Sequence, residues 1–383
     1  MTDLPPLDQS LLPPGIRSRF AEGINGLRMH VLEAGDPAGP CLLLLHGFPE
    51  LAYSWRKVMM PLAEAGYFVI TPDQRGYGRT TGWTDGYDID LREFRLFNLV
   101  RDQMALLASY GRTQVDAVFG HDFGSPVAAH CALMRPDVFR RVALMSAPHV
   151  GVPAMRGGAG PDVAPQKAID EALAALPRPR KHYHLYYSTP PANDDLMRCR
   201  QGLHAFFRAY YHHKSADWAA NRPHKLTGWT AGELAKMPTY YIMDRAETMA
   251  ETVAHEMPAA AVIAACRWMT EAEMAVYAGE YARTGFQGGL NFYRTRIEGT
   301  NAELDLFSGR AIECPSIFIG GAADWGVQQV PGGIERMRTA ACADMRAVHI
   351  VPGAGHWVQQ EQPEATVSLL LEFLQTTQAY ARR

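Results

Sequence analysis

Cysteine is scarce in this 383-residue sequence, and none of it is arranged in pairs. The six cysteines are scattered along the chain, without a C-x-x-C pair and without a Cys/His cluster at the spacing of zinc ligands. A disulfide framework and a zinc site are therefore disfavoured. We expect the cysteines to be thiols that fill the core.

Blocks of like charge and long hydrophobic runs are also missing. Lys and Arg number 37 and Asp and Glu number 40, so the formal net charge is −3, which disfavours a nucleic acid or an anionic membrane as partner. Aliphatic runs such as residues 42–45 are far too short to span a bilayer. No cationic stretch precedes an apolar one near residue 1, so we expect no secretory signal and a cytoplasmic location.

What the sequence does contain is an alternation of short apolar runs with helical patterns, typical of a mostly parallel sheet covered by helices. The helical spacing of Val100, Met104 and Leu107 predicts one such helix, and residues 124–134 predict another that stops before a proline. A helix is also expected near the end of the chain, around Leu370. The strands are expected at residues 27–33, 41–45, 67–71, 115–119, 142–145, 315–319 and 345–351.

The passage after Pro148 has a different composition. It is first rich in Gly and Pro and then in Tyr, His, Trp, Met and Ala. We interpret it as an inserted helical domain over about residues 151–305. The α/β core then consists of residues 1–150 and 306–383.

The segment Gly-His-Asp-Phe-Gly at residues 120–124 lies where a buried strand is expected to meet a helix. It has the small-x-nucleophile-x-small form of a nucleophile elbow, with Asp122 where serine is usual. Ser125, Ser146 and Ser308 lack the paired glycines, which argues against a serine esterase. The simplest alternative is that Asp122 only caps the helix that follows.

Three further segments favour the catalytic interpretation. His-Gly-Phe-Pro at residues 46–49 follows a strand, where a hydrolase of this build donates a backbone N–H to an oxyanion hole. Asp324 and His356 follow two later strands, so the chain order nucleophile, acid, histidine is satisfied. Each alone would be an ordinary loop residue, but their joint placement makes coincidence improbable. His121 is interpreted as a residue with a structural hydrogen bond.

Four segments together resemble the epoxide hydrolases of the α/β-hydrolase fold. They are HGFPE from residue 46, DQRGYG from residue 73, GHDFG from residue 120 and GAGHW from residue 353. The resemblance covers nearly the whole chain. It implies a helical cap inserted after the sixth strand, a small-molecule epoxide as substrate, and a reaction without a metal or an organic cofactor. No oligomeric state is indicated.

The resemblance also assigns roles to individual residues. It implies a triad of Asp122, Asp324 and His356, with the backbone N–H groups of Phe48 and Phe123 forming the oxyanion hole.

Two cap tyrosines activate the epoxide oxygen in this family. The segment Gly-Leu-Asn-Phe-Tyr-Arg at residues 289–294 resembles the family's motif and implies Tyr293. Its partner best matches Tyr183, with Tyr186 as the alternative. The residues expected to line the substrate pocket are Phe48, Pro49, Trp55, Phe123, Tyr186, Trp325 and Trp357.

These residue types make chemical sense without the resemblance. A carboxylate such as Asp122 is ionised at neutral pH, so it can attack an sp³ carbon without a base and form an alkyl ester. Water activated by His356 can then hydrolyse that ester, with Asp324 orienting the imidazole. Tyrosine hydroxyls, neutral at pH 7, can donate hydrogen bonds to the departing alkoxide. The apolar, aromatic insertion suggests a largely hydrophobic epoxide.

Two other functions, dehalogenation and non-catalytic binding of a small molecule, are compatible with parts of this pattern. Haloalkane dehalogenases share the aspartate elbow, but their typical motif has Trp directly after the aspartate, where this chain has Phe123. Fluoroacetate dehalogenases typically place Arg residues in the region of Phe123 and Ser125, which makes a small halo-acid less suitable. A non-catalytic, small-molecule-binding α/β-hydrolase usually lacks a triad member, and here all three are present.

Overall fold

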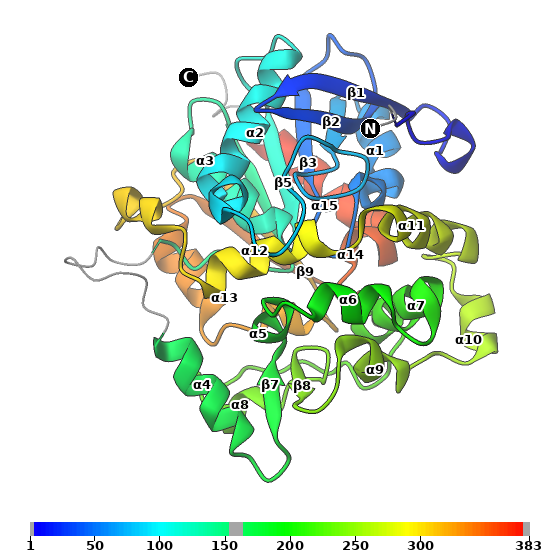
Figure 1. Ribbon diagram of the computed structural model, residues 1–383. Coiled ribbons are helices and arrows are strands. Elements are labelled where there is room, and N and C mark those ends of the chain that lie inside the picture. Colours follow the sequence, from blue (N-terminus) through cyan, green and yellow to red (C-terminus); the bar gives the residue numbers. More distant parts are fainter. Residues whose placement is uncertain (1–3, 153–163, 378–383) are drawn as a thin grey trace.

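An eight-stranded sheet with helices on both faces forms the centre of the structure, a computed structural model that describes residues 4–152 and 164–377 (Figure 1). The strand order is β1-β2-β4-β3-β5-β6-β9-β10. The β1–β2 and β2–β4 pairs are antiparallel, and the other pairs are parallel. This is the mostly parallel α/β sheet that the sequence predicted.

The central strands are buried from end to end, as expected of parallel strands covered on both faces. The predicted bounds are confirmed for β3, β6 and β10, and the other predicted strands differ by one or two residues. The strand β1 was not predicted, because its side chains are partly exposed and no continuous apolar run marks it. The strands are β1 Arg17–Ile24, β2 Leu27–Ala34, β3 Cys41–Leu45, β4 Phe68–Pro72, β5 Ala117–His121, β6 Val142–Met145, β9 Ser316–Gly321 and β10 Met345–Val351.

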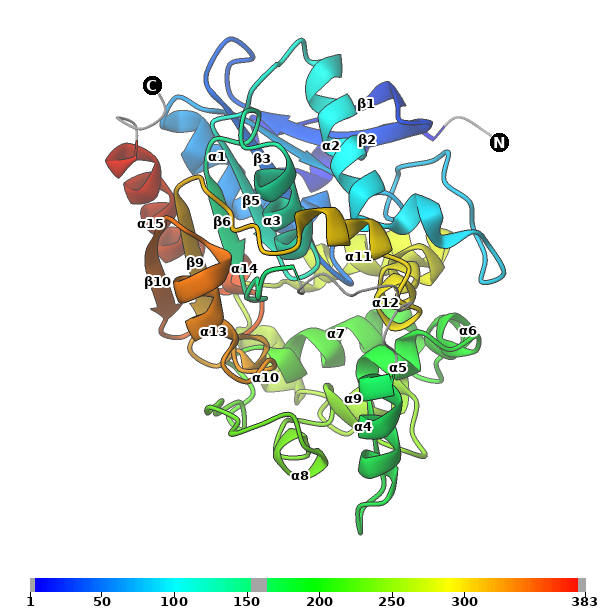
Figure 2. The same cartoon turned by 90° about the vertical axis from the view of Figure 1, so that its left-hand side faces the viewer.

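Helices α1 and α15 pack together on one face of the sheet, and α2 and α3 pack together on the other (Figure 2). The predicted helices α2, α3 and α15 are confirmed. The α-helices of the core are α1 Arg56–Glu64, α2 Leu96–Ser109, α3 Gly124–Met134, α13 Gly333–Arg336, α14 Val358–Glu361 and α15 Pro363–Thr376. Short 3₁₀ helices are η1 Gln9–Leu11, η2 Ala52–Trp55, η3 Leu91–Phe94, η4 Ala302–Phe307 and η5 Trp325–Val327, and η6 Met337–Ala341 is a short π-helix.

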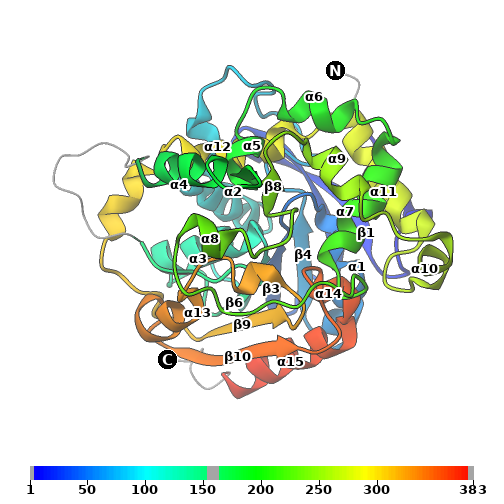
Figure 3. The same ribbon diagram turned by 90° about the horizontal axis from the view of Figure 1, so that it is seen from below.

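Between β6 and β9 the described residues 164–305, here named the inserted segment, are mainly helical. Figure 3 shows this segment in front of the sheet when the molecule is seen from below. The short antiparallel pair β7–β8 was not predicted. The elements are α4 Ala164–Ala174, β7 Arg180–His182, α5 Tyr183–Tyr187, α6 Ala192–Met197, α7 Gly202–Lys214, α8 Ala231–Leu234, β8 Ile242–Asp244, α9 Met249–Ala254, α10 Ala260–Ala265, α11 Glu271–Thr284 and α12 Gln287–Ile297.

The parallel pairing has one consequence for the site. The carboxyl ends of β3, β5, β9 and β10 lie at the same edge of the sheet, the edge that faces the inserted segment (Figure 2). Loops that follow these strands therefore meet there, as in other open α/β sheets. In residues 4–152 and 164–377 no helix has both the length and the apolar composition needed to cross a membrane.

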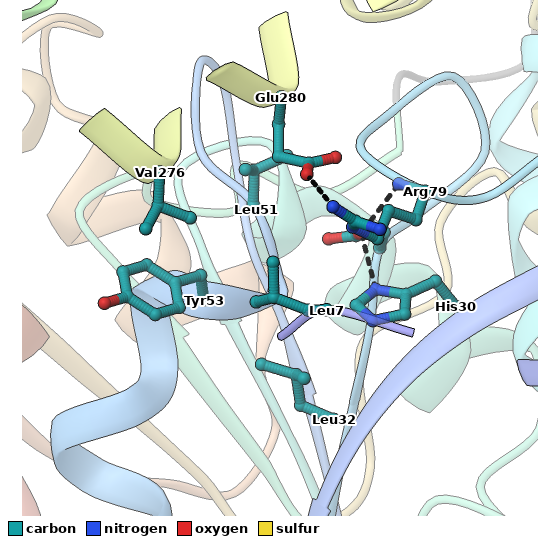
Figure 4. A pocket seen from close by; sticks show the side chains of 9 residues that line it. Leu7, His30, Leu32, Leu51, Tyr53, Arg79, Val276 and Glu280 are labelled. Atoms are coloured by element: carbon teal, nitrogen blue, oxygen red, sulfur yellow. Dashed lines mark hydrogen bonds and ion pairs between the residues drawn. The ribbon is translucent and has the colours of Figure 1, made fainter. Parts of the chain in front are cut away.

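A small hollow lies at another junction of the core with the inserted segment (Figure 4). Arg79 of the core forms an ion pair with Glu280 of α11 at 2.7 Å, and His30 Nδ1 lies 2.7 Å from Asp73 Oδ2. The lining contains no member of the predicted triad, so this hollow is separate from the site described below. It is lined by Leu7, His30, Leu32, Leu51, Tyr53, Asp73, Arg79, Val276 and Glu280.

Candidate active site

The turn between β5 and α3 holds Asp122 in a strained conformation. Its φ is +50°, in the left-handed region that costs energy for a residue with a Cβ. The turn is also tight, because a Cβ at Gly124 would lie 2.2 Å from the carbonyl oxygen of Leu45. The Asp122 side chain keeps 14% of its surface exposed. This geometry is that of a nucleophile elbow.

The imidazole of His356 lies between two carboxylates. Its Nε2 is 3.2 Å from Asp122 Oδ2, and its Nδ1 is 3.1 Å from Asp324 Oδ1. Asp324 Oδ1 also accepts a hydrogen bond from the N–H of Gly326 at 2.7 Å. The structure thus brings together the three residues that the chain order suggested as a triad.

The surroundings keep both carboxylates ionised. Burial disfavours the charged form of Asp122, but the hydrogen bonding and charge of His356, with the charge of Lys214, outweigh it and hold the pKa well below its usual range. Burial likewise disfavours ionised Asp324, and His356 again lowers its pKa below the ordinary value. The predicted nucleophile is therefore a carboxylate at neutral pH.

The loop after β3 reaches the nucleophile from the side. The backbone N–H of Phe48 donates to Asp122 Oδ1 at 2.9 Å. Phe123 directly precedes α3, so its N–H belongs to the helical turn whose amides have no partner within the helix. The two predicted oxyanion-hole residues thus flank Asp122, one in space and one in sequence.

Two tyrosines of the inserted segment lie near the nucleophile. Tyr183 begins α5 and Tyr293 lies in α12, with ring centroids 5.7 Å apart. The Tyr293 ring also meets the ring of Phe123 edge-on at 4.5 Å. Burial, together with the nearby charge of Asp122, raises the pKa of both phenols well above the ordinary value. Both hydroxyls therefore remain protonated and able to donate.

Tyr186, the alternative to Tyr183, has a different environment. The hydroxyl of Tyr186 donates to Asp195 Oδ2 at 3.0 Å, and Lys181 Nζ lies 4.8 Å from the centre of its ring. The Tyr183 hydroxyl instead accepts a hydrogen bond from the Gln329 side chain at 3.1 Å. The arrangement of the rings favours Tyr183 as the partner of Tyr293.

Two of the predicted pocket residues, Phe48 and Phe123, lie beside Tyr293. The rings of Phe48 and Phe123 both contact the ring of Tyr293, at 5.3 and 4.5 Å between centroids. Pro49 lies beside Phe48, and its carbonyl accepts a hydrogen bond from the hydroxyl of Tyr211 at 3.4 Å.

The three tryptophans occupy three separate places. Trp357 stacks on Tyr211 with centroids 4.1 Å apart, and its indole N–H donates to the carbonyl of the same residue at 2.9 Å. Trp325 meets His224 edge-on at 4.9 Å. Trp55 is fully buried in η2. Trp357 also meets the ring of His356 edge-on at 4.7 Å between centroids. That the three tryptophans line the substrate pocket stays a prediction.

Glu50 lies in a buried hydrogen-bonding position that the sequence did not predict. Its carboxylate Oε2 lies 2.5 Å from His121 Nδ1 and accepts the N–H of Gly47 at 3.0 Å. His121 Nε2 in turn lies 2.7 Å from the carbonyl of His356. This fully buried pair links the loops of Phe48 and His356. The only sequence signal was an acidic residue directly after His-Gly-Phe-Pro.

The six cysteines are free thiols. Within the described ranges, no three His, Cys, Asp or Glu side chains come together in a way that could hold a metal ion.

Comparison with known proteins agrees with this geometry. A family model described as alpha/beta hydrolase fold matches residues 40–168. Epoxide hydrolase A of Mycobacterium tuberculosis is 33% identical over 367 residues, which cover 91% of this chain and 95% of that protein. Epoxide hydrolase B of the same organism is 33% identical over 365 residues, which cover 91% of this chain and 96% of that protein.

Solved structures lead to the same family. An epoxide hydrolase from an endophytic Streptomyces has a TM-score of 0.74 at 31% identity, covering 95% of this chain and 96% of that one. Epoxide hydrolase A from Mycobacterium thermoresistibile has a TM-score of 0.72 at 30% identity, covering 94% and 98%. The resemblance inferred from the four sequence segments is confirmed. This chain belongs to the epoxide hydrolase family of the α/β-hydrolase fold.

Proposed function

We propose that this chain hydrolyses an epoxide to a vicinal diol through a covalent ester on Asp122. The main support is the position of that carboxylate, which lies at a strained turn, 3.2 Å from the imidazole of His356 and 2.9 Å from the N–H of Phe48. Tyr183 and Tyr293 supply two protonated phenols nearby.

In the first half-reaction, an oxygen of Asp122 attacks a carbon of the epoxide ring. A new C–O bond forms to the carboxylate, and the ring C–O bond breaks. The negative charge that develops on the ring oxygen is stabilised by the hydroxyls of Tyr183 and Tyr293, and a proton from a phenol completes the alcohol. A pair of donors suits an alkoxide, which accepts more than one hydrogen bond.

In the second half-reaction, water attacks the carbonyl carbon of the Asp122 ester. His356 removes a proton from this water, and Asp324 stabilises the imidazolium that forms. The N–H groups of Phe48 and Phe123 stabilise the oxyanion of the tetrahedral intermediate. Collapse of the intermediate breaks the C–O bond to the substrate, and the imidazolium of His356 returns its proton to the departing alkoxide. The remaining proton of the attacking water restores the phenol. The diol is released, and Asp122 is again a carboxylate, with one oxygen from water.

Isotope labelling tests this route. In a single turnover in ¹⁸O-labelled water, the diol should contain no label, because its new oxygen comes from Asp122. After many turnovers in labelled water, the label should enter both the carboxylate of Asp122 and the diol. Labelled diol in the first turnover would indicate direct attack by water and contradict the proposal.

A substrate panel separates this function from its alternatives. Diol formation from epoxides without halide release from haloalkanes or halo-acids supports epoxide hydrolysis. Halide release without diol would favour a dehalogenase. Binding of the panel without either product would favour a non-catalytic binding protein.

We further propose that the inserted domain expected at residues 151–305, of which the structure describes 151–152 and 164–305, acts as a cap over the sheet edge. We also propose that the substrate is a largely hydrophobic epoxide. The aromatic rings around Asp122, including Phe48, Phe123 and Tyr293, support an apolar substrate. The panel should therefore favour aryl and alkyl epoxides over polar ones. The cytoplasmic location stays a prediction that cell fractionation would test.

A further inference from the structure

A buried carboxyl group joins the inserted segment to the loop that carries His356. Glu361, at the end of α14, is only 8% exposed. Its Oε2 accepts the N–H groups of Ala216 and Gly355, each at 2.8 Å, and its Oε1 accepts the N–H of Trp357 at 3.0 Å. Two of these donors are the residues on either side of His356, and the third lies just beyond α7 in the inserted segment.

The backbone of His356 itself is bonded across the same junction. Its N–H donates to the carbonyl of Lys214, the last residue of α7, at 2.9 Å. The two backbones are in direct contact, because a Cβ at Gly355 would lie 2.5 Å from the carbonyl carbon of Ser215. The position of the histidine loop therefore depends on the docking of residues 214–216.

Side-chain packing strengthens this junction. The indole of Trp357 stacks on Tyr211 of α7, and the ammonium group of Lys214 lies 5.4 Å from the Trp357 ring. These contacts hold the residue that follows His356 against the inserted segment.

We propose that Glu361 is a positioning residue for His356. By binding the amides of Gly355, Trp357 and Ala216 together, it holds the imidazole at the distance required to activate water on the Asp122 ester. This inference rests on the proposed function, and it adds a residue that contacts none of the reacting atoms.

A carboxyl group suits this task better than an amide. Burial raises the pKa of Glu361 to about 8, although the three backbone donors act in the opposite direction. In either protonation state both of its oxygens remain acceptors. A glutamine has one acceptor oxygen and an NH₂ group that would face a backbone N–H, so at least one of the three hydrogen bonds is lost.

The expected defect is confined to one step. Ring opening uses Asp122 and the two tyrosines, whereas hydrolysis of the ester needs His356 in place. A displacement of the order of 1 Å can slow a reaction by about 100-fold. In Glu361→Gln we therefore expect ester hydrolysis to slow by about 10- to 100-fold, with the rate of ring opening nearly unchanged.

Steady-state and rapid-quench kinetics on an epoxide that the wild-type chain converts test this expectation. Slow hydrolysis alone lowers kcat and KM together, leaves kcat/KM near the wild-type value and lets the covalent adduct accumulate in the mass spectrum. Glu361→Asp keeps both oxygens but is one methylene shorter, so its rate of ester hydrolysis should lie between those of the wild type and Glu361→Gln. Glu364→Gln, an exposed position three residues further on, should behave as wild type.

Wild-type kinetics in Glu361→Gln would overturn the inference. So would a parallel fall of kcat and kcat/KM at constant KM, since a smaller folded fraction produces that result. If the wild-type chain forms neither adduct nor diol, the proposed function fails instead. Hydrogen exchange then tests the positioning role of Glu361 without turnover. The amides of residues 355–357 should exchange faster in Glu361→Gln, and exchange equal to that of the wild type would contradict this role.

Discussion

The Nε2 atom of His356 lies 3.2 Å from the Oδ2 atom of Asp122. The imidazole therefore adjoins the carboxyl group on which the proposed ester forms. Its other nitrogen is oriented by Asp324 at 3.1 Å. In the proposed mechanism the two groups have separate roles, because the carboxylate attacks without the base, whereas water needs the base to attack the ester.

His356→Gln should stop the reaction after its first half. Ring opening still occurs, but the ester on Asp122 persists because no group removes a proton from water. Intact-protein mass spectrometry should show a stable mass increase equal to that of the substrate, and kcat should fall by more than about 100-fold. A variant that turns over without an adduct would contradict the assignment of His356.

Asp122→Asn is the matched control for that experiment. The neutral amide cannot form the ester, so neither adduct nor diol should appear, while the circular dichroism spectrum stays that of the wild type. Because deamidation regenerates Asp122, the mass of the protein must be checked before the assay. Full activity in a verified Asn variant would exclude Asp122 as the nucleophile.

The two phenols should act together. Tyr183→Phe or Tyr293→Phe alone removes one of two donors to the alkoxide and should slow ring opening by about 10- to 1,000-fold. The double variant should lose nearly all ring opening, measured as adduct formation in a His356→Gln background. Tyr186→Phe is the control, because that hydroxyl donates to Asp195, and it should leave ring opening unchanged.

Gly124→Ala should disturb the elbow. The added methyl group would lie 2.2 Å from the carbonyl oxygen of Leu45, so the strand–turn–helix unit must shift. Overpacking of this kind costs about 1–3 kcal/mol, measured by denaturant unfolding, and activity should fall by more than stability explains. Gly279→Ala is the matched control in the exposed part of α11, where a Cβ meets nothing within 4 Å. It should stabilise the chain by up to about 1 kcal/mol.

Asp73 should make the free energy of unfolding depend on acid pH. Burial alone would raise its pKa, but the charge of His30 and the N–H of Arg79 outweigh this and lower it to about 2 from an ordinary 3.8. A carboxyl group whose folded-state pKa is depressed stabilises the fold above its unfolded-state pKa. This contribution, about 2 kcal/mol, is lost as the pH falls from about 4 to about 2.

Asp73→Asn should therefore destabilise the chain most at neutral pH. The difference from wild type, measured by urea unfolding at several pH values, should shrink by about 2 kcal/mol as the pH falls toward 2. The exposed position Asp85 provides the control, since Asp85→Asn should stay within about 0.5 kcal/mol of wild type throughout. A pH-independent difference for Asp73→Asn would contradict the depressed pKa.

Local sequence was sufficient to predict the central strands that lead to the candidate site. Cys41–Leu45 and Val142–Met145 are continuous apolar runs, and a buried parallel strand requires such a run. The elbow, the loop of Phe48 and the loop of His356 could be located because each follows a predicted strand, namely β5, β3 and β10. The outer strand Arg17–Ile24 could not be predicted, since its mixed polarity reflects partial exposure at the edge of the sheet.

The sequence alone could not distinguish Tyr183 from Tyr186, and the fold gives them different surroundings. Both residues lie in one short helix, and only packing directs one phenol toward Tyr293 and the other toward Asp195. Glu50 is a similar case. An acidic residue is normally exposed, and its burial became evident only once His121 was placed beside it.

The amino-acid sequence by itself indicated most strands of the large sheet, the family and the candidate nucleophile Asp122, because these depend on short-range patterns of apolar residues and glycines. The tertiary structure alone decided which polar groups from distant segments meet. His356 lies 234 positions after Asp122, and Glu361 lies 145 positions after Ala216. Only chain folding brings such groups within hydrogen-bonding distance, where burial and charge set their chemistry.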